Sequence, residues 1–262
     1  MLSYEFMQKA FIVGIALSLI MPLIGMVIVL RRLSMVGDSL SHSSLAGITA
    51  GLAFGFNPIV GAVASTLLAA FGIEAVRKRM PRYSDMAIAI ITSAGLGLTG
   101  ILTSFVKDST SFNSFLFGSI VTITTFELGL VLALALVVFL SLWFLSRELF
   151  IISLDPRSAI ISGIPVGLVN TVFTILIALT IAIASRTVGA LIVSSIMVIP
   201  VASAMQIASS YKKTRTLALV LAVFSTIVGL SLSFYLGLKP GASIVMVEVL
   251  ILIISLVYKG LK

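Results

Sequence analysis

The sequence contains no cysteine and only one histidine, and only 10% of its 262 residues are charged. The lack of cysteine excludes a disulfide framework, a thiolate metal site and a thiol nucleophile. No glycine-rich P-loop and no GxSxG or HExxH pattern occurs, so the chain offers no ATP-binding or hydrolytic motif of its own. Any energy-driven process in this chain therefore depends on a partner or on an ion gradient.

Apolar residues make up 60% of the sequence, and the mean hydropathy is +1.26. Because a helix needs about 20 apolar residues to cross a bilayer, these values predict an all-α, polytopic transmembrane protein with a single domain over residues 1–262. We expect no soluble catalytic domain, and no cleaved signal peptide in residues 1–9. About nine spans are predicted, over residues 11–30, 39–56, 58–76, 86–105, 126–146, 166–184, 187–205, 216–236 and 241–258.

The Lys and Arg residues lie between the predicted spans, so the net charge of +8 indicates contact with lipid headgroups and no nucleic-acid partner. Membrane proteins retain positive charge on the cytoplasmic side, which predicts an outer N-terminus and an inner C-terminus, with 13 basic residues inside and 4 outside. The inner set is Arg31, Arg32, Arg77, Lys78, Arg79, Arg82, Arg147, Arg157, Lys212, Lys213, Arg215, Lys259 and Lys262. The outer set is Lys9, Lys107, Arg186 and Lys239.

Asp38 and His42 are four residues apart near the start of the second predicted span, a spacing that places both on one helix face. A carboxylate and an imidazole so placed could share a divalent metal ion, although serine hydroxyls or water would have to complete the ligand set. The alternative is structural: Asp38 caps the helix and His42 hydrogen-bonds a neighbouring helix. Asp38 lies near the inner membrane edge, so a site deeper in a pathway requires that residues 31–37 dip into the membrane.

The predicted cytoplasmic loop over residues 154–166 is long and begins with Asp155-Pro156, a typical helix start. The loop ends at Gly163 and Pro165, so we predict a short helix outside the membrane. The pattern is equally compatible with an ordinary amphipathic connector.

Glu248 is the one acid inside an apolar run, so it is a candidate for lining a polar path. An interhelical hydrogen bond would explain its presence equally well. Residues 111–123 form a stretch too short to cross the membrane, and a loop or a partly inserted segment is expected there.

Six segments, in order, resemble the permeases of the zinc/manganese family of bacterial ABC importers, and together they span nearly the whole chain. Any one of these segments is a weak signal, but six in the right order are specific. They are the arginine pair followed by GDSLSHSSLAG at 37–47, RYSDMAIAI at 82–90, FLFGSI at 115–120, DPRSAIISGIPV at 155–166, VGALIVSSIMVIPVASA at 188–204 and KPGASIVMV at 239–247.

The resemblance implies a fold like that of type II ABC importer permeases, in the bacterial plasma membrane. It implies a homodimer of permeases, two ATP-binding subunits at the cytoplasmic face and an extracytoplasmic metal-binding protein. The chain itself would be a transport subunit and not an enzyme, with zinc or manganese as cargo, no permanently bound cofactor, and ATP on the partner subunit. Asp38 and His42 match the acid and the histidine of the family's translocation path. The residues that match its ATPase-coupling segment are Asp155, Pro156, Ala159 and Gly163.

Two other classes of function remain to be weighed. A self-contained secondary carrier is expected to show inverted repeats and several buried acids, whereas this chain has one central acid and no evident repeat. An intramembrane hydrolase needs a nucleophile with a base, or more metal ligands than one histidine supplies. Between the two metals, His42 favours zinc, while Asp38 and hydroxyl groups are also compatible with manganese.

Overall fold

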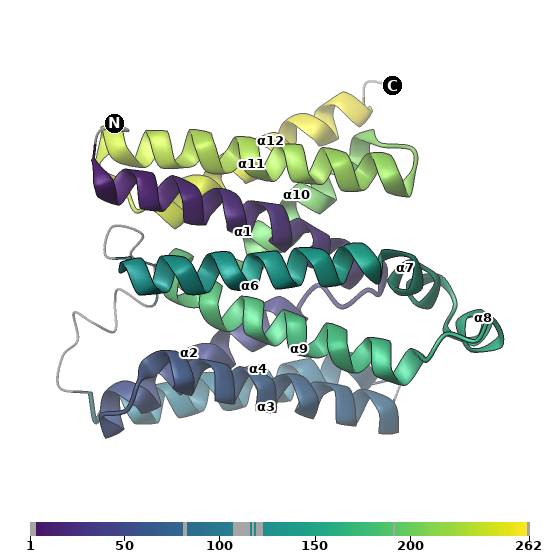
Figure 1. Ribbon diagram of the computed structural model, residues 1–262, viewed down its shortest axis with the longest axis horizontal. Helices are drawn as coiled ribbons and strands as arrows, with labels where there is room; N and C mark the ends of the chain where they lie inside the picture. Colours follow the sequence, from purple (N-terminus) through teal and green to yellow (C-terminus); the bar gives the residue numbers. More distant parts are fainter. Residues whose placement is uncertain are drawn as a thin grey trace.

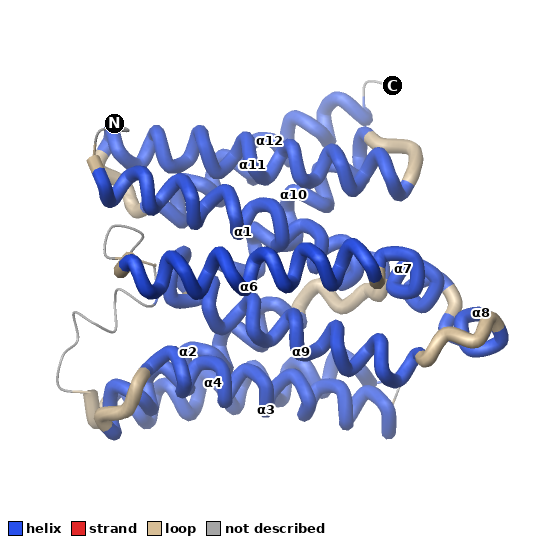
Figure 2. The backbone as a smooth tube through the Cα atoms, in the orientation of Figure 1, coloured by secondary structure: helices blue, strands red, loops and turns tan. Residues whose placement is uncertain are grey.

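The computed structural model describes residues 4–80, 83–106, 116, 118, 123–190 and 192–260, and every regular element within this part is a helix (Figure 2). The all-α prediction is therefore confirmed. The long helices are α1 (Glu5–Leu30), α2 (Val36–Phe54), α3 (Pro58–Arg79), α4 (Ser84–Thr103), α6 (Thr125–Phe144), α9 (Val166–Ala184), α10 (Val193–Ile207), α11 (Tyr211–Leu236) and α12 (Pro240–Gly260). The short elements are α7 (Ser146–Leu154), α8 (Pro156–Ile161) and the π-helical turn η3 (Ser185–Gly189).

Seven helical stretches in the described part of the chain are long and apolar enough to cross a membrane. The two other predicted spans correspond to α2, which has 19 residues, and to α10, which has 15. The predicted range 187–205 is wrong at its start, because η3 extends α9 to Gly189 and α10 begins only at Val193. Gly189 has a φ of 109°, which interrupts the helix without lowering the hydrophobicity of the run. Most of the stretch 111–123 lies outside the described residues.

Short-range capping explains where several helices begin and end. The Asn57 side chain accepts a hydrogen bond from the Ile59 N–H (2.9 Å), and Pro58 occupies the first turn of α3. Gly55 and Gly237 adopt left-handed conformations (φ 77° and 65°) directly after α2 and α11. The chain therefore reverses direction at these points because of the capping residues and glycines located there.

The start of α1 and the end of α12 lie at opposite ends of the helical bundle, as an odd number of crossings requires (Figure 1). The C-terminal end of α12 lies at the same end of the bundle as α7 and α8 (Figure 1). The last turns of α3 and α12 and the first turn of α11, which carry basic residues of the predicted inner set, reach that end too. The basic residues are thus segregated in space, as the topology prediction expects.

Close helix crossings depend on glycine. A Cβ on Gly25 of α1 would overlap the carbonyl group of Met197 in α10, and a Cβ on Gly47 of α2 would overlap the carbonyl group of Gly61 in α3. Helices in a membrane gain much of their attraction from such close van der Waals packing, because lipid is as apolar as their side chains. These crossings fix α1 against α10 and α2 against α3.

The connector between α1 and α2, residues 31–35, runs back from the end of α1 toward the middle of the bundle (Figure 2). As a result, Val36 and Gly37, the first residues of α2, are buried, and Gly37 lies against the side chain of Met197. This course of the connector is the one that the predicted dip requires. It places the start of α2 inside the bundle and not at its surface.

Candidate functional site

Asp38 and His42 lie on one face of α2, with His42 Nε2 3.7 Å from Asp38 Oδ2. Only 14% of the His42 side chain is exposed, against 35% of the Asp38 side chain. Asp38 does not cap α2, because the helix begins after Met35 and has no side-chain cap. The buried His42 Nδ1 has no hydrogen-bond partner among the described residues. Neither structural explanation offered for this pair is present in the fold.

The separation of the two donors suits a shared metal ion. Zinc bonds of 2.0–2.2 Å in tetrahedral geometry place two ligand atoms about 3.4 Å apart. The observed 3.7 Å exceeds hydrogen-bond range but needs only a small rotation to hold an ion between the two side chains. Within the described residues, no group of three or more His, Asp or Glu side chains could hold a metal, so the pair is an incomplete ligand set.

The serine hydroxyls considered as additional ligands are engaged in helix packing. Ser41 Oγ donates to the Gly37 carbonyl (2.8 Å), and Ser43 Oγ donates to the Ser39 carbonyl (2.9 Å). Ser39 Oγ donates to the Ile88 carbonyl in α4 (3.3 Å). Only the Ser39 bond joins α2 to another helix, because the other two lie within α2, and all three hydroxyl groups have only their oxygen lone pairs left for a cation.

The backbone around His42 is fixed by direct contact with α3 and α4. A Cβ on Gly95 of α4 would lie 3.0 Å from the backbone of His42 and Ser43, so the two helices touch at this point. Ser65 Oγ of α3 donates to the Ser43 carbonyl (2.8 Å). A functional side chain carried by such a rigid support keeps its position without help from the ligand.

The segment from Asp155 to Gly163, called here the α8 segment, is held by hydrogen bonds among its own residues. The Asp155 carboxylate accepts hydrogen bonds from Ser158 Oγ (2.6 Å) and from the Arg157 N–H (2.9 Å), and both contacts lower the pKa of Asp155 below its usual value. Pro156 occupies the first turn, and Gly163 ends the helix with a φ of 80°. The predicted short helix is therefore present.

The α8 segment presents an apolar surface at the basic end of the bundle. Ala159 is fully buried, whereas Ile160 and Ile161 are 63% and 87% exposed. The segment lies beyond the ends of the long helices in Figure 1. Exposed isoleucines at that place suit contact with another protein.

Arg31, which the charge pattern places among the inner basic residues, also has a specific role in packing. Its Nη1 donates to Asn170 Oδ1 in α9 (2.9 Å), its Nε donates to Ser153 Oγ in α7 (3.2 Å), and the guanidinium lies 5.2 Å from the centre of the Phe173 ring. Burial lowers the pKa of Arg31 from its usual value to about 10, with Arg77 nearby as a second cause, so the group stays charged at neutral pH. The partners are distant in sequence, and no local sequence pattern predicts them.

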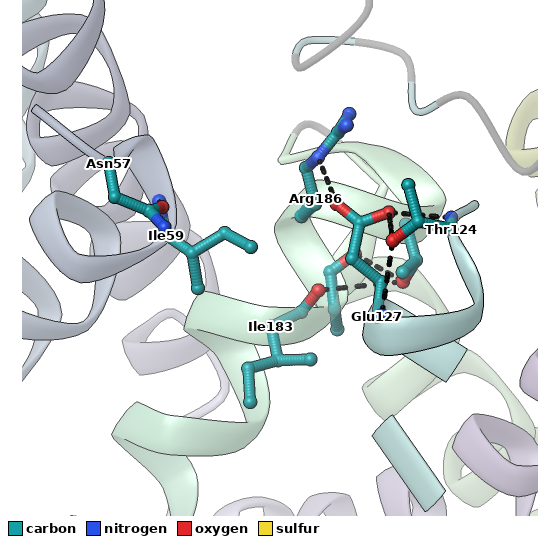
Figure 3. Close-up of polar contacts among 8 residues, drawn as sticks. Asn57, Ile59, Thr124, Glu127, Ile183 and Arg186 are labelled. Carbon is teal, nitrogen blue, oxygen red and sulfur yellow. Dashed lines mark hydrogen bonds and ion pairs between the residues drawn. The ribbon is translucent and has the colours of Figure 1, made fainter. Parts of the chain in front are cut away.

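A second polar contact that the sequence analysis misses joins α6 to η3 at the opposite end of the bundle. Arg186 Nε donates to Glu127 Oε1 (3.1 Å), and Glu127 also forms a capping box with Thr124 at the start of α6 (Figure 3). The Thr-x-x-Glu pattern at 124–127 is a recognisable signal for such a cap. The ion pair attaches the π-helical turn to α6.

Glu248 is 1% exposed within α12. Neither of its carboxylate oxygens has a hydrogen-bond partner in the described part of the chain. The interhelical hydrogen bond considered for it is therefore not seen, and the structure gives this residue no assigned role.

The apolar helices, the segregated charges and the exposed short helix define a multi-pass membrane protein. The chain belongs to the ABC 3 transport family, whose model matches residues 3–259. It is therefore a multi-pass protein of the bacterial plasma membrane, with the type II ABC importer permease fold that the resemblance implies.

Two curated relatives cover nearly the whole chain. The manganese transport system membrane protein MntC of Listeria monocytogenes is 30% identical, over 98% of this chain and 92% of its own length. The high-affinity zinc uptake system membrane protein ZnuB of Haemophilus influenzae is 29% identical, over 97% of both chains. The solved structure of PsaBC from Streptococcus pneumoniae in complex with Fab superposes with a TM-score of 0.85 at 28% identity, covering 96% of this chain and 91% of that one.

Proposed function

We propose that the chain is the membrane-spanning permease subunit of an ATP-driven importer for a divalent transition metal ion, with zinc favoured over manganese. The observation that carries the proposal is the Asp38–His42 pair, which lies half-buried at the inner start of α2 without a structural task. Placing an ionisable pair there costs free energy, and such residues in membrane proteins usually have a function. The names of the relatives support a metal as cargo and include both zinc and manganese.

The pair serves as a waypoint for the ion and not as a permanent cage. Two donors bind a divalent ion weakly, which suits an ion that must leave again. In a homodimer, a second copy of Asp38 and His42 facing the same axis completes a set of four ligands. The Asp38 charge offsets part of the energy needed to strip water from the ion.

The α8 segment is the docking site for an ATP-binding subunit. Its place at the basic end, which the charge distribution predicts to be cytoplasmic, and its exposed Ile160 and Ile161 support this assignment. The energy for transport then comes from ATP hydrolysis on that separate subunit. An extracytoplasmic binding protein delivers the metal at the opposite end of the bundle.

The preference for zinc rests on the imidazole of His42, because manganese prefers oxygen ligands. The test is metal accumulation in cells that lack this chain, with zinc and manganese measured together in the same culture at limiting supply. We expect zinc accumulation to fall and to return when the chain is restored. A fall in manganese alone would correct the metal, and unchanged levels of both would overturn the proposed function.

A further inference from the structure

The guanidinium of Arg31 binds both helices that flank the α8 segment. Ser153, which accepts from Nε at 3.2 Å, lies in α7 two residues before Asp155. Asn170, which accepts from Nη1 at 2.9 Å, lies one turn into α9. A displacement of the α8 segment that carries either flanking helix with it must therefore pull on this side chain.

The backbone of Arg31 lies in the connector that leads into α2, the helix that carries Asp38 and His42. It follows the last residue of α1 and opens the connector to α2, where the Leu33 N–H donates to the Ile28 carbonyl (3.0 Å) and the Val36 N–H donates to the Leu33 carbonyl (2.9 Å). Arg32 takes a left-handed conformation (φ 57°), which is rare for a residue other than glycine and closes the turn tightly. A connector held in this way passes movement on to the first turn of α2 instead of absorbing it.

An open cavity lies between the α8 segment and α3 beside this link. It has a volume of about 490 Å³, and Arg31, Pro156, Asn170 and Arg77 are among the residues that line it. Because the cavity separates Pro156 from α3 at this level, direct packing does not join the α8 segment to α3 there. The two hydrogen bonds of Arg31 provide a bridge along the edge of the cavity.

A simple headgroup anchor would look different. An anchoring arginine is exposed, hydrated and replaceable by lysine. Arg32 is exposed, as expected of such an anchor, whereas Arg31 is buried enough to lower its pKa to about 10, and its Nη2 has no hydrogen-bond partner in the described part of the chain. The cost of burying this charge makes anchoring alone a poor explanation for Arg31.

We propose that Arg31 is a positioning residue that transmits movement of the α8 segment to α2 and hence to Asp38 and His42. The inference rests on the proposed function, because it takes the α8 segment as the docking site of the ATPase. Asp38 lies in the first turn of α2, directly after the connector that Arg31 opens. One path from the docking site to the metal pair thus passes through one side chain and one short turn, beside the direct packing of α9 against α2 and α3.

The test uses the complex of this chain with its ATP-binding subunit and binding protein in proteoliposomes, and measures metal taken up per ATP hydrolysed. For Arg31→Ala we expect this ratio to fall about tenfold, within the usual range of coupling between distant sites, while ATP hydrolysis continues. Arg31→Lys should give an intermediate ratio, because lysine keeps the charge but not the fork that reaches two acceptors. The matched control is Lys212→Ala, which removes an exposed charge at the same end of the bundle but outside the connector, and which should leave the ratio unchanged.

Two further variants decide the matter if Arg31→Ala assembles poorly. Asn170→Leu and Ser153→Ala each remove one acceptor and leave the connector intact, and each should lower the ratio. Combining Asn170→Leu with Arg31→Lys should cost less than the sum of the two single effects. An unchanged ratio in all of these variants, or a parallel fall in uptake and hydrolysis, would overturn the inference. Failure of the proposed function would appear instead as absent ATP-dependent uptake by the unmodified complex.

Discussion

The Asp38–His42 pair and the α8 segment differ in which contacts hold them. The α8 segment is held mainly by its own residues, whereas the pair depends on other helices. The α8 segment is held by contacts within a few residues, such as the Ser158 hydroxyl bond to Asp155 and the left-handed Gly163. The proposed metal pair has only two donors, and its position depends on α3, α4 and α10. In the proposed function, the docking helix needs only a fixed surface for its partner, whereas the waypoint for the ion must be incomplete in one copy so that the ion can leave.

The largest expected effect is a loss of metal uptake on replacing the Asp38–His42 pair, without a loss of binding to the ATP-binding subunit. His42→Ala should lower metal uptake at limiting supply about 100-fold or more, since even residues that only support a metal ligand often contribute 10–100-fold. Asp38→Asn should act in the same direction, because it keeps the shape but removes the charge that offsets dehydration. Uptake of radioactive metal is the measurement, with binding of the ATP-binding subunit recorded in parallel and expected to stay normal.

Thr49→Val serves as the control for this prediction. Thr49 lies on the same helix and donates only to the Leu45 carbonyl, so its replacement should leave uptake unchanged. Normal uptake in a double variant with both His42→Ala and Asp38→Asn would show that the pathway lies elsewhere.

A smaller effect tests whether packing positions the pair. Gly47→Ala places a methyl group into the carbonyl of Gly61, so α2 and α3 must separate. Such overpacking typically costs about 1–3 kcal/mol of stability, measurable by thermal unfolding in detergent. Gly129→Ala in α6 adds the same methyl group where nothing lies within 4 Å, and it should be neutral or slightly stabilising. Equal unfolding temperatures for the two variants would contradict a tight crossing of α2 and α3.

The smallest effect concerns the α8 segment. Gly163 has a φ of 80°, and an alanine there pays a conformational cost of about 1–2 kcal/mol. We expect Gly163→Ala to weaken binding of the ATP-binding subunit about 5- to 30-fold in a direct binding assay, without changing metal affinity. Gly167→Ala, in open space one turn later, is the matched control. If the two variants bind equally well, the ATPase does not depend on the shape of the α8 segment.

The predictions from sequence succeed where the physical signal is local. Apolar run length predicts the long helices, the i,i+4 spacing brings Asp38 and His42 onto one face, and Asp155-Pro156 marks the start of α8. The late start of α10 is not predictable in this way, because the residues before Val193 are as apolar as those after it. The role of Arg31 depends on Ser153 and Asn170, which are 122 and 139 residues away. Only the folded chain brings such partners together.

The π-helical turn Ser185–Gly189 changes which face of the helix the side chains around it point to. A π-turn adds one residue to a helical turn, so the side chains on its two sides no longer follow one continuous period of 3.6. Arg186 sits within this turn, and the shift in phase contributes to the direction in which it reaches Glu127. Because Gly189 then interrupts the helix and α10 begins only at Val193, helix faces assigned to α9 cannot be extended through residues 185–189 into α10.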